Sequence, residues 1–139
     1  MTHVLIVAAN FYQDITDELV KGATQTLVAQ GITYDVECVP GAFEIPAAVR
    51  FALKPPRYDG FIALGCVIRG ETTHYDYVCG ESARGLMSLA LEYEAAIGYG
   101  ILTVENEEQA WVRARITEGN KGRDATLACL RMIELKHKL

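Results

Sequence analysis

The chain has 139 residues, half of them hydrophobic, a formal charge of −5 and a pI near 5.2. This length suits one domain, residues 1–139, that folds around a core of its own. The acidic balance, without a Lys/Arg cluster, excludes a general nucleic-acid binder, and no apolar run is long enough to cross a membrane, so we expect a cytoplasmic protein.

The first two predicted elements are a strand and a helix. Residues 4–8 form a short apolar run, as in a buried strand. Asp14 or Thr16 is expected to cap the helix, and Gly31 to end it in the left-handed conformation. The helix is predicted from apolar residues that recur at helical spacing, namely Ile15, Leu19, Ala23 and Leu27.

A second strand and a second helix precede the most apolar run of the chain. Residues 34–39 alternate in polarity, which predicts a strand close to a sheet edge. The segment 40–46, PGAFEIP, then turns into a helix that runs to about Leu53, with Pro46 tolerated in its first turn. After two prolines, the almost wholly apolar run 61–68 predicts a central strand covered by helices on both faces.

The turn after this third strand is the most distinctive stretch. Residues 65–80 read GCVIRGETTHYDYVCG and include His74, the only histidine away from the chain ends. Thr72 or Thr73 can cap the following helix, whose free N-terminal amides would make an anion site. An ordinary strand–turn–helix corner with a surface histidine fits the same residues, so the turn alone leaves both interpretations open.

Four further elements complete the chain. A long helix with one apolar stripe is expected to stop at Gly98, and residues 99–104 predict a fourth strand. Asn106 and Gln109 form a candidate capping box for the next helix. A last helix is expected after residues 119–122, GNKG, and its basic end complements the helix dipole.

Strands that alternate with helices predict an α/β fold. We expect a three-layer α/β/α sandwich around a four-stranded parallel sheet of flavodoxin-like order 2-1-3-4. In such sheets ligands bind at the carboxyl ends of the strands. The polar or aromatic segments 10–11, 41–44, 69–74 and 103–106 all follow strand ends, so they should converge on one rim suited to a small, anionic, partly planar ligand.

Several residues keep a second interpretation. Phe11 can be a core residue, Glu44 a partner of the helix dipole, and Arg113 a surface arginine. The cations that could neutralise a phosphate are Arg69, Arg113 and Lys121, and Arg113 is expected to reach the rim only from another copy of the chain.

The cysteines and histidines predict no metal site. Cys38, Cys66, Cys79 and Cys129 lack Cys-x-x-Cys spacing and are interpreted as small buried hydrophobic residues. A catalytic thiol at Cys66 or Cys79 stays an alternative, because both flank the distinctive turn. The three histidines are scattered and lack ligand spacing.

Three motifs together carry a family resemblance: GAFEIP at 41–46, GCVIRGETTHYDYVC at 65–79 and GNKGRDA at 119–125. In this order and spacing, over nearly the whole chain, they resemble the 6,7-dimethyl-8-ribityllumazine synthase family. The resemblance implies a transferase of riboflavin biosynthesis that condenses 5-amino-6-(D-ribitylamino)uracil with 3,4-dihydroxy-2-butanone 4-phosphate, without a cofactor. It also implies a homo-oligomer, a pentamer or a multiple of it, with active sites between adjacent subunits.

The resemblance further implies a role for each matching residue. Phe11 stacks on the pyrimidine ring, and Ala42, Phe43 and Glu44 hold the ribityl chain. The backbone at Val67 and Ile68 binds the ring edge. The amides of Glu71 and Thr72 hold the phosphate, and His74 carries protons. The phosphate is also met by Arg113 of a neighbouring protomer, and Lys121, which can likewise join the site from another chain, lies near the ring and ribityl group. Asp124 orients His74, and Tyr99 covers the ring.

The chain departs from the family pattern at two places, and two other functions remain as alternatives. Asn10-Phe11-Tyr12 stands where the family usually has Arg-Phe-Asn, and Tyr99 stands where it commonly has Phe. The alternatives are a riboflavin synthase of the archaeal kind and a non-enzymatic flavin- or lumazine-binding or shell-forming paralogue.

Overall fold

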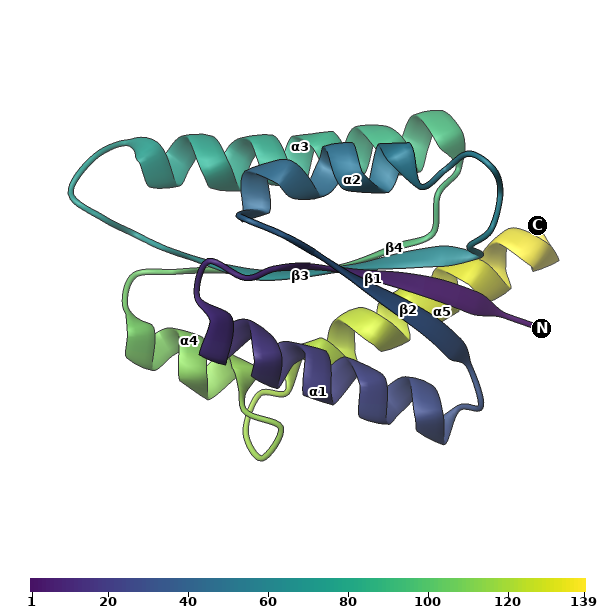
Figure 1. Cartoon of the computed structure of the whole chain (residues 1–139), viewed down its shortest axis with the longest axis horizontal. Helices are drawn as coiled ribbons and strands as arrows, with labels where there is room; N and C mark the ends of the chain where they lie inside the picture. Colours follow the sequence, from purple (N-terminus) through teal and green to yellow (C-terminus); the bar gives the residue numbers. More distant parts are fainter.

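A parallel sheet lies between two layers of helices in the computed structural model, which describes all residues 1–139 (Figure 1). The sheet has the order β2-β1-β3-β4, and every neighbouring pair is parallel, so the predicted fold class and strand order are confirmed. The strands are β1 (His3–Ala9), β2 (Thr33–Val39), β3 (Gly60–Ile68) and β4 (Ile97–Val104).

The two faces of the sheet are covered by different helices. Helices α2 (Ile45–Phe51) and α3 (His74–Tyr93) cover one face. The other face carries α1 (Gln13–Ala29), α4 (Glu107–Ala114) and α5 (Lys121–Lys138) (Figure 1). Each face buries its own apolar cluster, and β3 contributes to both because almost all of its residues are buried. The prediction of a central third strand is therefore confirmed.

Helix α5 approaches its neighbours at two glycines. A Cβ atom on Gly98 of β4 would lie 1.9 Å from the Ala125 carbonyl oxygen, and one on Gly122 would lie 2.1 Å from the Leu19 carbonyl oxygen. No side chain fits at either position, so backbone packs directly on backbone. These contacts fix the start of α5 against both β4 and α1.

Several predicted helix ends differ from those observed. Helix α3 ends at Tyr93 because Glu94 takes the left-handed conformation (φ 54°), so Gly98 is not its stop but a residue of β4. Helix α2 ends at Phe51, two residues before the expected position, and α5 starts at Lys121, within the expected GNKG turn. Gly31, with φ 71°, follows α1 as predicted.

Side-chain capping is also only partly as predicted. Neither Asp14 nor Thr16 caps α1, because both lie inside it, and the buried Thr16 hydroxyl donates instead to the Ala9 carbonyl (2.7 Å). Asn106 caps α4 by accepting a bond from the Gln109 amide (2.9 Å). The return bond of the expected capping box comes from the Glu105 amide, one residue before Asn106. None of the helices has the length and hydropathy of a membrane span.

Candidate active site

A cavity of about 730 Å³, here called the strand-end cavity, opens where β1 and β3 end and α2 and α3 begin. It forms where the sheet order reverses around β1 and β3, the place at which α/β sheets bind ligands. The predicted site residues that line it come from four separate segments: Phe11, Ala42, Phe43, Glu44, Val67, Ile68, Thr72 and His74.

One wall of the strand-end cavity is aromatic. Phe11 is 74% exposed and Phe43 is 55% exposed, so neither is a core residue. The Phe11 ring packs edge-on against Tyr12, with centroids 4.9 Å apart and planes at 82°. This contact orients a ring whose face remains open to a planar ligand.

Glu44 closes the turn that follows β2. Its Oε1 atom accepts a hydrogen bond from the Gly41 amide at 2.9 Å, at the start of the short 3₁₀ helix Ala42–Glu44. The carboxylate therefore shapes the turn as well as facing the cavity. A second oxygen of the same group remains to accept a bond from a ligand hydroxyl.

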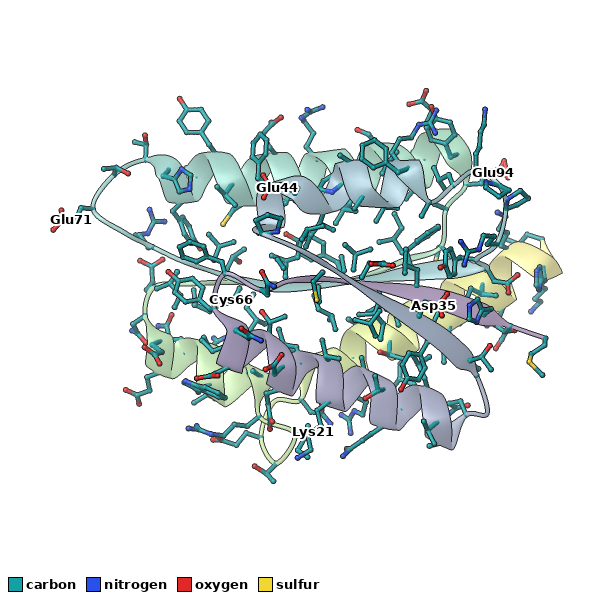
Figure 2. The ribbon with its side chains drawn as sticks, viewed as in Figure 1. Lys21, Asp35, Glu44, Cys66, Glu71 and Glu94 are labelled. Atoms are coloured by element: carbon teal, nitrogen blue, oxygen red, sulfur yellow. The ribbon has the colours of Figure 1, made fainter.

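The turn between β3 and α3 supplies unpaired backbone donors. The amides of Gly70, Glu71 and Thr72 donate to no group of the chain, whereas the His74 amide donates to the Thr72 hydroxyl at 3.3 Å. Free amides at the start of a long helix favour an anion. The Glu71 side chain lies at the outer tip of the turn and points away from the molecule (Figure 2), so only its amide is suited to binding.

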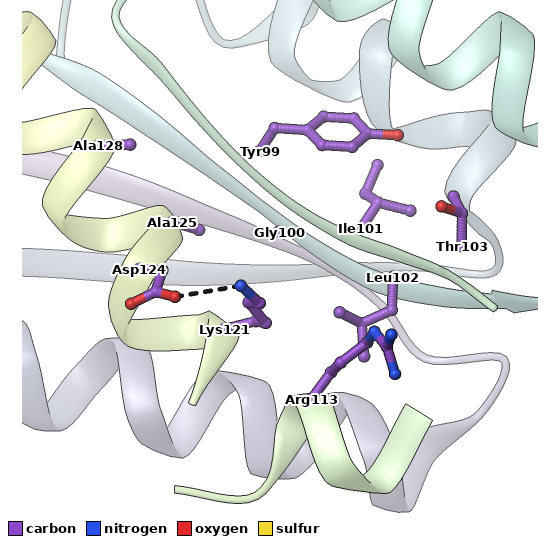
Figure 3. A pocket seen from close by; sticks show the side chains of 10 residues that line it. All are labelled: Tyr99, Gly100, Ile101, Leu102, Thr103, Arg113, Lys121, Asp124, Ala125 and Ala128. Carbon is purple, nitrogen blue, oxygen red and sulfur yellow. Dashed lines mark ion pairs between the residues drawn. The ribbon is translucent and has the colours of Figure 1, made fainter. Parts of the chain in front are cut away.

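The remaining predicted residues lie around a different cavity. This β4-edge cavity, of about 340 Å³, is lined by Tyr99, Arg113, Lys121 and Asp124. Figure 3 shows Tyr99 on one side of the β4 ribbon and the three charged side chains on the other, so the cavity straddles the open edge of the outermost strand. Burial raises the pKa of the Tyr99 phenol, which keeps it neutral.

Arg113 is the cation of the β4-edge cavity that lacks a carboxylate partner. Its guanidinium donates to the Gln109 carbonyl of its own helix at 3.0 Å. Lys121, by contrast, pairs with Asp124 at 3.4 Å. The two cavities share no residue, and one chain does not bring His74 and Asp124 together.

Comparison with known proteins agrees with the motifs that occupy these two cavities. A family model described as 6,7-dimethyl-8-ribityllumazine synthase matches residues 1–137. The chain belongs to this family. The 6,7-dimethyl-8-ribityllumazine synthase 1 of Rhizobium meliloti (strain 1021) is 58% identical, over 99% of this chain and 93% of its own length.

Two further members of the 6,7-dimethyl-8-ribityllumazine synthase family are similarly related. The protein of that name from Agrobacterium fabrum (strain C58) is 56% identical, over 99% of this chain and 96% of its own length. The one from Bartonella bacilliformis (strain KC583) is 55% identical, over 98% of this chain and 91% of its own length. These matches span both groups of predicted residues.

Sequence reasoning missed two aromatic residues of the strand-end cavity. Tyr12 and Tyr75 line it, and each directly follows a predicted site residue. Their position beside Phe11 and His74 was the available signal. Tyr12 adds a phenol ring to this wall of the cavity, in edge-on contact with Phe11.

The cysteine predictions hold for three of the four residues. Cys66 and Cys129 are buried and Cys79 is half-buried, but Cys38 is exposed because it lies on the edge strand β2. Burial raises the pKa of Cys66 to about 12 and also raises that of Cys79. Both thiols are protonated at neutral pH, which argues against the catalytic-thiol alternative. No cluster of three His, Cys, Asp or Glu side chains is arranged to hold a metal ion.

Proposed function

We propose that this chain condenses 5-amino-6-(D-ribitylamino)uracil with 3,4-dihydroxy-2-butanone 4-phosphate to give 6,7-dimethyl-8-ribityllumazine, phosphate and water. Membership of the lumazine synthase family supports the reaction. The observation that carries it for this chain is that Phe11, Glu44 and His74, from three distant segments, line one cavity. That cavity matches a planar, hydroxylated substrate together with a phosphate.

The chemistry needs positioning and proton transfer. The amine of the pyrimidine attacks the ketone and water leaves to give an imine, phosphate is then eliminated, and ring closure releases a second water. Holding two reactants side by side removes much of the entropic barrier. His74 is suited to move protons between these steps, because an imidazole ring can both accept and donate a proton.

Each wall of the strand-end cavity has a part in this proposal. Phe11 stacks on the pyrimidine, and Ala42, Phe43 and Glu44 hold the ribityl chain. The backbone at Val67 and Ile68 reads the ring edge. The free amides of Glu71 and Thr72 hold the phosphate, as helix N-termini do.

We further propose that the β4-edge cavity of one copy completes the strand-end cavity of the next copy in a homo-oligomer, a pentamer or a multiple of it. Arg113, without a carboxylate partner, would meet the phosphate. Lys121 would approach the ring and ribityl group, Tyr99 would cover the ring, and Asp124 would orient His74. The open edge of β4 supports such an arrangement, because an exposed edge strand is usually covered.

Incubation of the purified protein with both substrates tests the reaction. We expect lumazine fluorescence to appear faster than in a protein-free control, and no riboflavin to form from lumazine alone. Riboflavin in the second tube would assign a riboflavin synthase instead. Tight binding of lumazine without turnover in either tube would assign a binding paralogue.

A further inference from the structure

Arg69 was one of three cations that could neutralise a phosphate, but its guanidinium already has three partners within the chain. Its Nε atom donates to both carboxylate oxygens of Glu105, at 2.9 and 3.1 Å. One Nη atom lies 3.5 Å from Asp76. The plane of the guanidinium also covers the Tyr75 ring, with 4.3 Å between Cζ and the ring centroid.

These contacts join three segments, of which the backbone links only the ends of β3 and β4, through the Arg69 amide and the Val104 carbonyl (2.9 Å). Arg69 follows β3, Glu105 follows β4, and Tyr75 and Asp76 lie in the first turn of α3. Glu105 is itself fixed, since its amide donates to the Gln109 side chain at 2.8 Å. A charge-assisted hydrogen bond to Glu105, combined with a second ion pair and a cation–π contact, restrains geometry more than a single surface ion pair does.

The turn that Arg69 spans has few other restraints. Residues 70–73 are exposed, a Cβ atom at Gly70 would contact nothing, and the one side-chain bond within the turn joins Thr72 to the His74 amide. Yet this turn carries the free amides and the histidine that face the strand-end cavity. Without Arg69, the first turn of α3 would be held to the sheet mainly by apolar packing.

We propose that Arg69 is a positioning residue, which by binding Glu105, Asp76 and Tyr75 together fixes the β3–α3 turn for the phosphate-bearing substrate. This inference rests on the proposed function. In it, Arg69 holds the turn that binds the substrate and does not itself contact the substrate. A direct phosphate contact is disfavoured because Glu105 and Asp76 already neutralise the Arg69 guanidinium.

Three variants separate positioning from direct binding. Arg69→Gln removes the ion pairs with Glu105 and Asp76. Arg69→Lys keeps the positive charge but loses the planar guanidinium group. Glu105→Gln removes the carboxylate that binds Arg69 and leaves Arg69 intact. We expect all three to reduce kcat/KM for the butanone phosphate by roughly 10- to 100-fold, as small misplacements do, with a smaller change in KM for the pyrimidine. If Arg69 bound phosphate directly, Glu105→Gln would leave the KM for the butanone phosphate unchanged or lower it. This result would overturn the proposal.

A second readout does not depend on activity. Hydrogen exchange of the unliganded protein should accelerate at the hydrogen-bonded amides of His74, Asp76 and Tyr77 in Arg69→Gln and Glu105→Gln, and unchanged exchange there would also overturn the proposal. Arg84→Gln is the matched control, because Arg84 also pairs with a carboxylate, that of Glu81 further along α3, and its loss should alter neither measurement. If the wild-type protein formed no lumazine but the two variants still exchanged faster, the proposed reaction would be refuted. The role of Arg69 in holding the β3–α3 turn would still stand.

Discussion

His74 occupies the first position of α3, where it lies beside the free amides of the β3–α3 turn. It is exposed, lines the strand-end cavity and has no carboxylate partner within its own chain. A histidine in this position can exchange protons with both a ligand and the solvent. Proton transfer, and not binding strength, is therefore the property that its removal should affect.

His74→Ala should lower kcat by roughly 100- to 10,000-fold, the usual range for proton transfer, without abolishing the reaction, because the bound reactants still lie side by side. Steady-state kinetics with both substrates, corrected for the uncatalysed rate, provide the measurement. His137→Ala, at the far end of α5, is the matched control and should behave as wild type. An unchanged kcat in His74→Ala would remove this residue from the mechanism.

Which residues line the strand-end cavity could be predicted where position along the chain relative to a strand end decides it. Phe11, Glu44 and His74 each follow a strand end, and parallel strands bring such ends to one side of the sheet. The engagement of Arg69 by Glu105 was not predictable, because residues 36 positions apart meet only through the β3–β4 register. The exposure of Cys38 was missed for a different reason. Apolar neighbours in the sequence do not show which face of an edge strand is left exposed.

At the scale of elements, the strands were predicted more accurately than the helix ends. Apolar runs locate a strand directly, whereas a helix end depends on a few backbone contacts. Glu94 illustrates this, because a residue without an unusual turn preference takes the left-handed conformation there, and Lys136 donates to its carbonyl at 2.8 Å from α5. A tertiary contact of this kind leaves no local pattern in the sequence.

The start of α5 is the element whose placement we expect to be most sensitive. Gly122→Ala should lower the free energy of unfolding by about 1–3 kcal/mol, the usual cost of overpacking, because its Cβ would meet the Leu19 carbonyl oxygen at 2.1 Å. Gly80→Ala in α3 is the control, since its Cβ would contact nothing, and it should raise stability by about 0.5–1 kcal/mol. Urea unfolding at one fixed protein concentration measures both. Equal effects of the two substitutions would contradict the backbone contact.

For the whole molecule, the strand order followed from connection rules, but the position of Tyr99 and Asp124 beside Arg113 and Lys121, in a second cavity, did not. Alternating strands and helices allow few topologies, and the order 2-1-3-4 is one of them. Arg113 and Asp124 follow β4 in the chain, yet α4 and α5 carry them to the outer edge of that strand. Sequence spacing alone does not distinguish that edge from the strand-end cavity.

Mixed assemblies of two defective variants test whether the two cavities meet across an interface. His74→Ala and Arg113→Ala, produced together in equal amounts, should recover about a quarter of wild-type activity at limiting butanone phosphate, because random assembly pairs an intact half of each kind at that frequency. The two variants assembled separately and then mixed should show no such recovery. If the activity of the co-produced sample did not exceed that of this control, His74 and Arg113 would not serve one site from two different copies.

The location of the two cavities on different parts of one surface also decides how catalytic capacity would scale with assembly. Each copy would contribute one half-site of each kind, so a head-to-tail row of copies always leaves an incomplete half at either end, whereas a closed ring leaves none. Turnover per chain would then be greatest in closed rings and would disappear as dilution returns the protein to single copies. Quaternary closure would thus be part of the enzyme's chemistry and not only of its stability.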